Sequence, residues 1–506
     1  MPPLISARWR AHAALLVFGG LATTLSVAQD SERAWLAGDS HIHSHWSPGY
    51  DRTVTPPVAI QGRDALYPTP LNARMAQSFG LSWMVTTDHG GPNHAKLNLT
   101  HAYAELQQSR ELVPDVLQFY GMELNMPAMD HHTLIIPRAD FEASALYDLE
   151  QRFDANETFP VDPARRTEAA RIAALTYMSS LPRLPLVFAN HPSRSAKGLG
   201  MFGQDEPWEI RGNIDVAPQV YRGMEGGPGH QAGSLSQGVA SVTALDAGDG
   251  NVEKPLPVGV RGGYRNPGAH TLGGFDQMAA VVGGLWDSLL GEGRHFWIVA
   301  TSDSHVHYSE PTRRGSDFWP GEFHKTYVHA RKTYDDVIDG LRQGRMFAVA
   351  GDLITVLDVE AASGSRRARA GETLHATAGA PVTVTIRLRD PDALNHGGLN
   401  PRVMRVDLIT GEVRGRLIDR HAALNETTRV TARFASPDWT RKGDEIEIVT
   451  TIPAVRRNIY LRVRGTNGGD LEPQMDVPGE NPWTDLWFYS NPIFISVSAT
   501  ETQPNR

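Results

Sequence analysis

Residues 82–89 read SWMVTTDH, a short apolar run that ends in an aspartate and a histidine. Other apolar runs end in a similar way: LQFYGMEL (117–124) carries Glu123, LVFA (186–189) precedes Asn190-His191-Pro192, and FWIVA (296–300) precedes Thr301-Ser302-Asp303-Ser304-His305. Short apolar runs separated by longer helical or loop segments are typical of buried strands in an α/β fold. Such folds gather their sites where parallel strands end, so we expect these polar side chains to share one site.

An earlier motif, GDSHIHS at residues 38–44, carries two histidines. Residues i and i+2 of a strand point to the same side, so Asp39, His41 and His43 are expected to project together. Two imidazoles about 6–7 Å apart along a strand can converge on one ion, and Asp39 can orient a ligand. Alone, this pair is also compatible with incidental histidines at a polar strand edge. The recurrence of His, Asp and Glu after successive apolar runs favours a shared metal site.

The pattern of apolar and polar residues changes near Asp352. Residues 29–352 alternate apolar runs with longer segments, including predicted helices at 163–180 and 334–343 and a glycine-dense stretch, 223–274, that we expect to be a long loop. Residues 353–498 show period-two alternation, as at Val382, Val384, Ile386 and Leu388, which predicts an antiparallel β-sandwich. Residues 499–506 are expected to form a tail.

The N-terminus has the pattern of a secretory signal. Arg8 and Arg10 precede a short apolar run, and Ser26-Val27-Ala28 is a small-x-small cleavage site. We therefore expect residues 1–28 to be removed and the protein to be secreted or periplasmic, with no membrane attachment after cleavage. An uncleaved N-terminal anchor is the alternative.

Composition narrows the chemistry. The net charge is −9, from 48 basic and 57 acidic residues, and no basic block occurs, so nucleic-acid binding is not expected. Cysteine is absent, so any metal must be held by nitrogen and oxygen ligands. Such a site suits Zn²⁺, Mn²⁺ or Fe²⁺.

The order of the motifs H-x-H, T-D-H, G-x-E, a histidine before a strand, N-H-P and D-x-H resembles the PHP (polymerase and histidinol phosphatase) superfamily of metallohydrolases. The resemblance covers roughly residues 35–352 and implies a distorted (β/α)7 barrel with two or three divalent metal ions. It implies His41, His43, Glu123 and Asp303 as ligands of one metal, and Glu123, a histidine of the 131–132 pair and His191 as ligands of a second. His89 and His305 would belong to a third.

Two positions depart from the family pattern or leave it open. Where the family usually has an acid or a histidine for the third metal, this chain has Ser47-Pro48-Gly49, and Asp51 or His45 is the expected substitute. The register of residues 133–135 favours His131 over His132 as the ligand.

The resemblance predicts a hydrolase that uses metal-activated hydroxide on a small-molecule ester. We expect a phosphoesterase, with Glu123 and Asp303 as catalytic residues and Arg194 meeting an anionic substrate oxygen; a surface salt bridge is the alternative for Arg194. A carboxylic ester or carbamate hydrolase, similar to the CehA/McbA group, is the competing hypothesis, because only Arg194 and, further away, Arg261 or Arg265 could bind a phosphate. His230 and His270 lie on the glycine-dense stretch, where we expect ordinary loop histidines, with a place in a pocket lid as the alternative. His307 is expected behind His305, and the C-terminal domain could contact carbohydrate.

Overall fold

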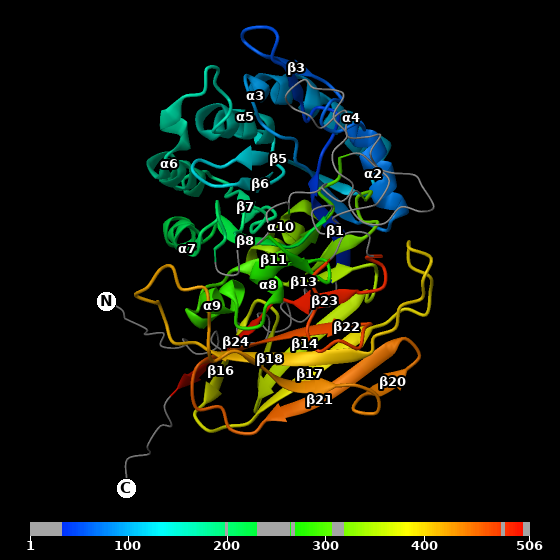
Figure 1. Cartoon of the computed structure of the whole chain (residues 1–506). Coiled ribbons are helices and arrows are strands. Elements are labelled where there is room, and N and C mark those ends of the chain that lie inside the picture. Colours follow the sequence, from blue (N-terminus) through cyan, green and yellow to red (C-terminus); the bar gives the residue numbers. More distant parts are fainter. Residues whose placement is uncertain are drawn as a thin grey trace, which may run out of the picture.

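The computed structural model describes residues 33–197, 201–229, 264, 269–305, 318–476 and 481–498. The predicted signal segment and tail lie outside these residues, as do His230, Arg261, Arg265 and His307. The fold is a mixed α/β arrangement with one large mixed sheet and further antiparallel sheets (Figure 1). Among the described residues, no helix is both long and apolar enough to cross a membrane.

The N-terminal part of the large sheet holds the strands that the apolar runs predict. Its order is β11-β8-β7-β6-β5-β4-β1-β12-β13, and neighbours β1/β4, β4/β5, β7/β8 and β8/β11 are parallel. The strands are β1 (Ala34–Ile42), β4 (Trp83–Thr86), β5 (Leu117–Asn125), β6 (His131–Ile136), β7 (Leu186–Ala189), β8 (Tyr221–Pro228), β11 (Trp297–Thr301), β12 (His324–Ala330) and β13 (Met346–Ala350). Beyond β11, a parallel bridge joins Ser304 to Ile42, so the strand at one end of this order approaches the end of β1.

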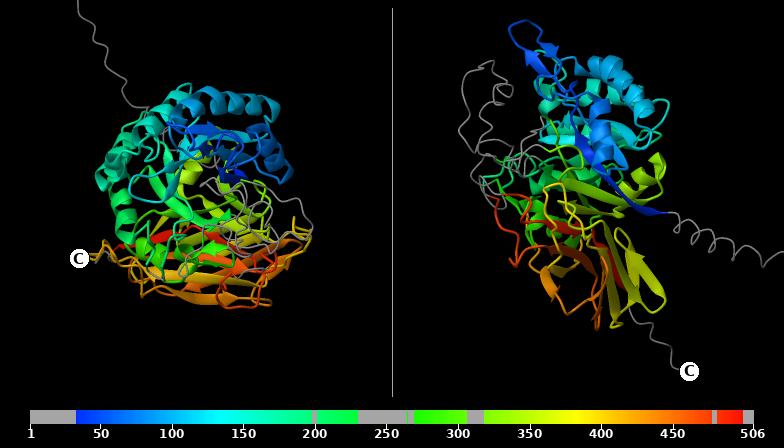
Figure 2. Two further views of the ribbon diagram at one scale, coloured as in Figure 1. Left: turned by 45° about the horizontal axis from the view of Figure 1, so that its top comes forward. Right: turned by 90° about the vertical axis from the view of Figure 1, so that its right-hand side faces the viewer.

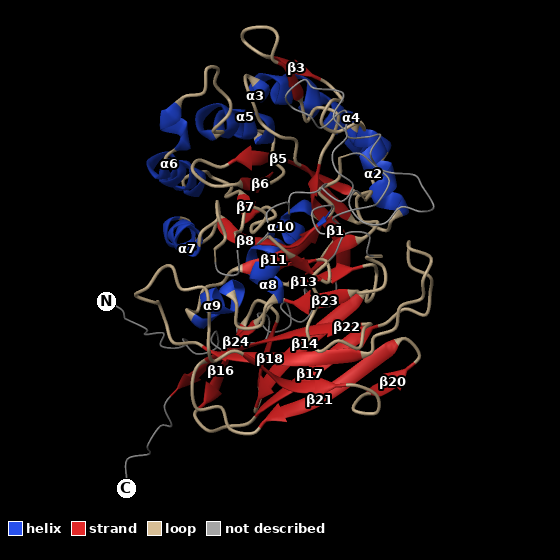
Figure 3. Cartoon of the chain, in the orientation of Figure 1, coloured by secondary structure: helices blue, strands red, loops and turns tan. Residues whose placement is uncertain are grey.

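The left view of Figure 2 shows the blue to teal helices as an arc along the outer side of the N-terminal strands. Helices follow most of these strands. They are α2 (Thr69–Ser78), α3 (His94–Leu97), η1 (Asn98–Ala102), α4 (Tyr103–Leu112), α5 (Glu142–Phe153), η2 (Pro163–Arg166), α6 (Glu168–Ser179), α7 (Pro207–Val216), α8 (Gln277–Ala280), α9 (Leu285–Gly291) and α10 (Tyr334–Gln343). Figure 3 shows that the described helices belong to this part of the molecule.

Three local predictions can be compared with the structure. The helix at 334–343 is confirmed: the Thr333 hydroxyl accepts from the Asp336 amide, and Gly344, with φ of 76°, ends it. The helix expected at 163–180 is split, because Thr167 caps a helix that begins only at Glu168. The prediction of a loop from residue 223 was wrong at its start, because residues 223–228 continue the buried strand β8. Glycine there permits close packing, since a Cβ on Gly223 would lie 2.3 Å from the Trp297 carbonyl oxygen.

The C-terminal region is made of strands, as the alternation predicts. One antiparallel sheet has the order β15-β14-β17-β21-β20: β14 (Val356–Ser363), β15 (Arg366–Arg369), β17 (Val382–Arg389), β20 (Thr440–Lys442) and β21 (Glu445–Ile452). The other strands extend the large sheet, because β13 pairs with β23: β16 (Thr373–Thr377), β18 (Arg405–Glu412), β19 (Arg429–Phe434), β22 (Ile459–Thr466), β23 (Trp487–Ser490) and β24 (Ile493–Ser498). The large sheet therefore contains strands from both sides of residue 352, where the sequence pattern changes.

A buried ion pair also joins the two regions. Both nitrogens of the Arg462 guanidinium that face Asp287 lie 2.7–2.8 Å from its carboxylate, and the Tyr460 hydroxyl donates to the same group at 3.0 Å. Asp287 comes from α9 and its partners from β22, and all three residues are buried. Because Asp287 and Arg462 neutralise one another, loss of either side chain would leave the charge of the other unpaired in the interior.

Candidate metal centre

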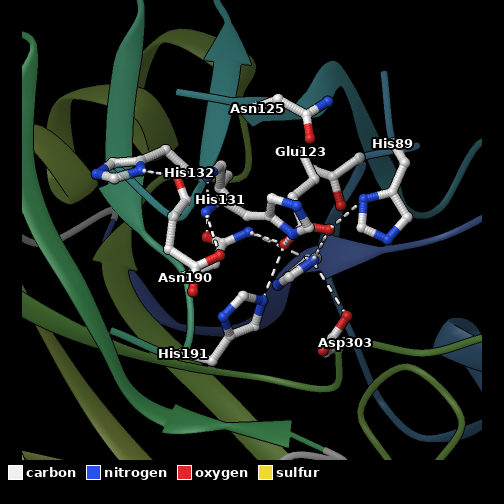
Figure 4. Close-up of polar contacts among 12 residues, drawn as sticks. His89, Glu123, Asn125, His131, His132, Asn190, His191 and Asp303 are labelled. Carbon is white, nitrogen blue, oxygen red and sulfur yellow. Dashed lines mark hydrogen bonds and ion pairs between the residues drawn. The ribbon is translucent and has the colours of Figure 1, made fainter. Parts of the chain in front are cut away.

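Histidines and carboxylates from successive strand ends converge on one place (Figure 4). His41 and His43 come from the end of β1, His89 follows β4, Glu123 lies in β5, His131 begins β6, His191 follows β7, and Asp303 and His305 follow β11. His191 and Asp303 have positive backbone φ angles of 31° and 47°, which residues other than glycine rarely adopt. The strand ends thus bring together all eight residues predicted as ligands, two of them on strained backbone, a feature common at functional sites.

Glu123 is the common member of the cluster. Its Oε1 lies 3.0 Å from both His131 Nδ1 and His191 Nε2, and its Oε2 lies 2.8 Å from His89 Nδ1 and 3.4 Å from both His41 Nε2 and His43 Nε2. The carboxylate is fully buried. Burial works to raise its pKa, but the charges of the surrounding histidines hold the pKa well below its usual range. A carboxylate with histidines against both oxygens is placed to be shared between ions.

Three groups of side chains have ligand atoms close enough to hold an ion, with all atoms of a group within 4.8 Å of one another. They are His41, His43, Glu123 and Asp303; His89, Glu123 and His131; and His43, Asp64, His89 and His305. The first resembles the predicted first ligand set residue for residue. The second differs from prediction in that His89 takes the position expected for His191, whose Nε2 contacts the Oε1 side of Glu123.

Asp64 supplies the acid that seemed to be missing after the first motif. Its Oδ2 accepts from the Ser47 hydroxyl at 2.6 Å and lies 3.7 Å from His89 Nε2 and 3.6 Å from His305 Nε2. Burial works to raise its pKa, but His305, His89 and His43 hold the pKa below its usual value. No local pattern pointed to Asp64, because it reaches the site only after a small hairpin, β2 (Gly49–Asp51) and β3 (Val58–Ile60), has folded back.

The expected substitutes for that acid were wrong. The Asp51 carboxylate accepts from the backbone amide and hydroxyl of Thr53, and His45 Nε2 contacts Glu105 Oε2 at 2.7 Å. Asp51 is thus bound within its own loop and His45 by a residue of α4, and neither belongs to the three groups.

The arrangement around His41 fits a metal ion. His41 Nδ1 lies 2.6 Å from Glu225 Oε1, so a neutral ring carries its proton there and turns the lone pair of Nε2 inward. That lone pair lies 3.0 Å from His43 Nε2 and 3.2 Å from Asp303 Oδ1. Lone pairs this close must be offset either by a proton on one of the atoms or by a cation among them. A divalent ion with nitrogen and oxygen ligands satisfies all of them at once.

Glu225 is a residue of the candidate centre that the sequence analysis missed. Besides the His41 ring, its carboxylate accepts from the His191 backbone amide at 2.6 Å and from the Thr301 hydroxyl at 3.0 Å. It lies in β8, within the stretch expected to be a loop, and this explains why it was not found. A carboxylate behind a ligating histidine fixes the ring tautomer and raises its basicity as a ligand.

Asp39 and Asn190 support the ligands in other ways. Asp39 accepts from the backbone amides of His41 and Ser302, so it fixes the main chain rather than a ring, and burial raises its pKa to about 7. The Asn190 amide donates to Glu123 Oε1 at 3.0 Å, and its oxygen accepts from the Thr133 amide. The predicted grouping of Asp39 with the histidines therefore holds in position, but its side chain turns to the backbone.

The structure distinguishes the two histidines at the start of β6. His131 faces Glu123, whereas His132 contacts the Tyr221 hydroxyl at 3.2 Å and the Asp130 carbonyl oxygen at 3.0 Å (Figure 4). Arg194 donates to both oxygens of Asp130, at 2.8 and 2.5 Å, and its Nη2 lies 3.3 Å from His131 Nδ1. The salt-bridge alternative for Arg194 is thus present, but at the margin of the site. His270 is half-buried and belongs to none of the three groups.

Burial divides the cluster into an inner and an outer part. His41, His43, Glu123, His191 and Asp303 are almost wholly enclosed, whereas Asp64, His89 and His131 are 22–24% exposed and line a cleft of about 470 Å³. A small molecule would therefore meet the Asp64–His89–His131 side first. A second cleft, on the C-terminal strands, is lined by residues such as Thr410, Thr431 and Arg429, and its described lining has no aromatic side chain on which a sugar ring could stack.

Comparisons with known family models and with curated proteins found no match to this chain.

Proposed function

We propose that this chain is a metal-dependent hydrolase of the PHP type, acting on phosphate esters. The observation that carries the proposal is Glu123, a buried carboxylate with histidines against both oxygens, shared between two groups of potential ligands that adjoin a third. The order of the motifs in the chain and the nitrogen and oxygen donor set agree with it. The bridge from Ser304 to Ile42 supports a barrel in which the strand series closes at β1.

Divalent ions at such a centre lower the pKa of a bound water and polarise an ester oxygen. The residues of the chain have separate tasks. Glu123 and Asp303 supply the negative charge that balances the ions, the histidines act as neutral ligands, and Glu225 keeps His41 in the required tautomer. Arg194, held by Asp130 and 25% exposed, places a positive charge beside His131, where an anionic substrate oxygen would lie.

A carboxylic ester or carbamate is the second candidate substrate. The observation in its favour is that Arg194 is already paired with Asp130, which reduces its attraction for a phosphoryl group. Metal chemistry permits both reactions, because the same polarisation serves either electrophile. Secretion after removal of residues 1–28, a C-terminal β-sandwich and a carbohydrate contact through it remain parts of the proposal.

The test is a metal-counted preparation assayed side by side on p-nitrophenyl phosphate, bis-p-nitrophenyl phosphate, p-nitrophenyl acetate and an aryl carbamate. We expect two or three bound ions and turnover of a phosphate ester, and in His41→Ala we expect loss of turnover and of the ion of the first group. The exposed His375 on β16 provides the control, and His375→Ala should keep both. Turnover of only the acetate and carbamate would replace the phosphoesterase proposal by its alternative. An unaltered metal content in His41→Ala would refute the centre itself.

A further inference from the structure

The cleft above the outer part of the metal centre has two walls of separate origin. One is the connection between β2 and β3, residues 52–57, which projects at the top of Figure 1. The other is the stretch from Asn156 to Arg166, which follows α5. Asp64, His89 and His131 also line the cleft. Whatever binds between the walls therefore has one end at the proposed ions.

Each wall contributes an exposed arginine. Arg52 lies on the hairpin connection and Arg166 at the end of η2. Within the described parts of the chain, neither forms an ion pair with a carboxylate, whereas Arg194 donates through two nitrogens to the carboxylate of Asp130. Arg166 instead donates to the side-chain oxygen of Asn156 at 2.5 Å, which holds its guanidinium at the cleft without neutralising it. Two positive charges on opposite walls, without acidic partners, favour a negatively charged occupant.

The same walls expose apolar side chains. Val54, Phe159 and Val161 are 42, 45 and 42% exposed and line the cleft. Apolar groups clustered in a cleft, unlike scattered ones, mark a place where an apolar ligand surface is covered. The occupant that matches both observations has an apolar body as well as a negative charge.

We propose that the substrate is an amphipathic anion, an ester whose leaving portion carries a flat or branched apolar body and a second negative charge. The apolar body lies between Val54 and Phe159, and Arg52 and Arg166 bind the remote charge. The inference rests on the proposed function in one respect, namely that the scissile group lies at the Asp64–His89–His131 end. It goes further in naming residues outside the metal centre that select the substrate.

The experiment compares two matched esters, phenyl phosphate and 4-(carboxymethyl)phenyl phosphate, in which a methylene insulates the reacting bond from the added charge. The metal-loaded enzyme should show kcat/KM about tenfold higher for the charged ester, the combined effect of two partly exposed charge contacts. In the double variant Arg52→Gln/Arg166→Gln the ratio should fall to near one. The control is Arg74→Gln on the exposed face of α2, outside the cleft, which should keep the wild-type ratio. Phe159→Ala should lower kcat/KM for both esters about fivefold without changing their ratio.

Calorimetric binding of the two corresponding phosphonates, which cannot be hydrolysed, separates this inference from the proposed function. If the charged phosphonate binds more tightly and the double variant removes the difference, the inference holds even if neither ester turns over, and only the proposed reaction fails. If both esters turn over but their ratio is near one in the wild type, or persists in the double variant, the inference is overturned while the phosphoesterase stands. Absence of both binding and turnover refutes both.

Discussion

Replacement of Glu225 by glutamine tests whether the buried carboxylate behind His41 makes that histidine a ligand. In the wild type its two oxygens receive three donors, from the His41 ring, the His191 amide and the Thr301 hydroxyl. Glutamine offers a single oxygen, so its NH2 group must face either the His41 ring or the His191 amide. Loss of such a partner behind a ligand typically weakens metal binding about 10- to 100-fold. This corresponds to about 1.4–2.7 kcal/mol.

The assay is competition for the metal with a chelator of known affinity, followed by ion counting. Glu292→Gln is the matched control, because Glu292 is also buried and also holds two charged partners, Arg211 and Arg294, but lies outside the metal centre. Both variants should unfold more easily, by about 1–3 kcal/mol for an unsatisfied buried group, but only Glu225→Gln should bind metal more weakly. An equal metal affinity in Glu225→Gln and wild type would refute the positioning role of Glu225.

Three further predictions concern the outer ion, pH and the contact between regions. Asp64→Asn should reduce the metal content by one equivalent while two ions remain, as measured by mass spectrometry; an unchanged count would contradict the third group. Burial works to lower the pKa of His94, but Glu150 raises it to about 9 from 6.5, so this pair stabilises the fold below pH 6.5 and is lost as pH rises through 9. The free energy of unfolding should therefore fall about 3 kcal/mol more in wild type than in His94→Gln across that window, and parallel curves would contradict the pair. Arg462→Met should cost about 3–5 kcal/mol by leaving Asp287 unpaired, and Asp287→Leu added to it should restore much of the loss in chemical denaturation; a full additive loss would argue against the pairing.

The sequence predicted the part of the site that lies on strand ends. His41 lies on β1 and His43 directly follows it, and the structure brings their Nε2 atoms to 3.0 Å from one another. The pairing of β1 with β4 is irregular over the same stretch, between Asp39 and Ile42. Hydrophobic runs fix where a strand ends, and the residue that follows a parallel strand is thereby placed at the edge of the sheet. This is why the motif residues could be placed without knowledge of the tertiary contacts.

The two carboxylates that were missed, Asp64 and Glu225, have no such local signal. Asp64 approaches His89 and His305 only because a hairpin reverses the chain between Ser47 and the helix α2, and the spacing across a hairpin is not fixed by periodicity. Glu225 lies between glycines, which weaken the pattern of a strand. Those same glycines let β8 pack closely against β11: Gly223 faces Trp297, Gly226 faces Ile298 and Gly227 faces Ala300.

The difference in burial between inner and outer ligands has a consequence for how ions are held. The inner group combines two carboxylates and two imidazoles at almost no exposure, so each attraction acts in a low dielectric and each ligand is held by a buried partner such as Glu225. The outer group, which contains Asp64, His89 and His305, has one carboxylate and partly exposed imidazoles. Water therefore competes for an ion held there. An ion in the outer group should therefore exchange more readily than one in the inner group. The ligands that a substrate would meet first are thus the least enclosed ones. An open coordination position requires such an arrangement.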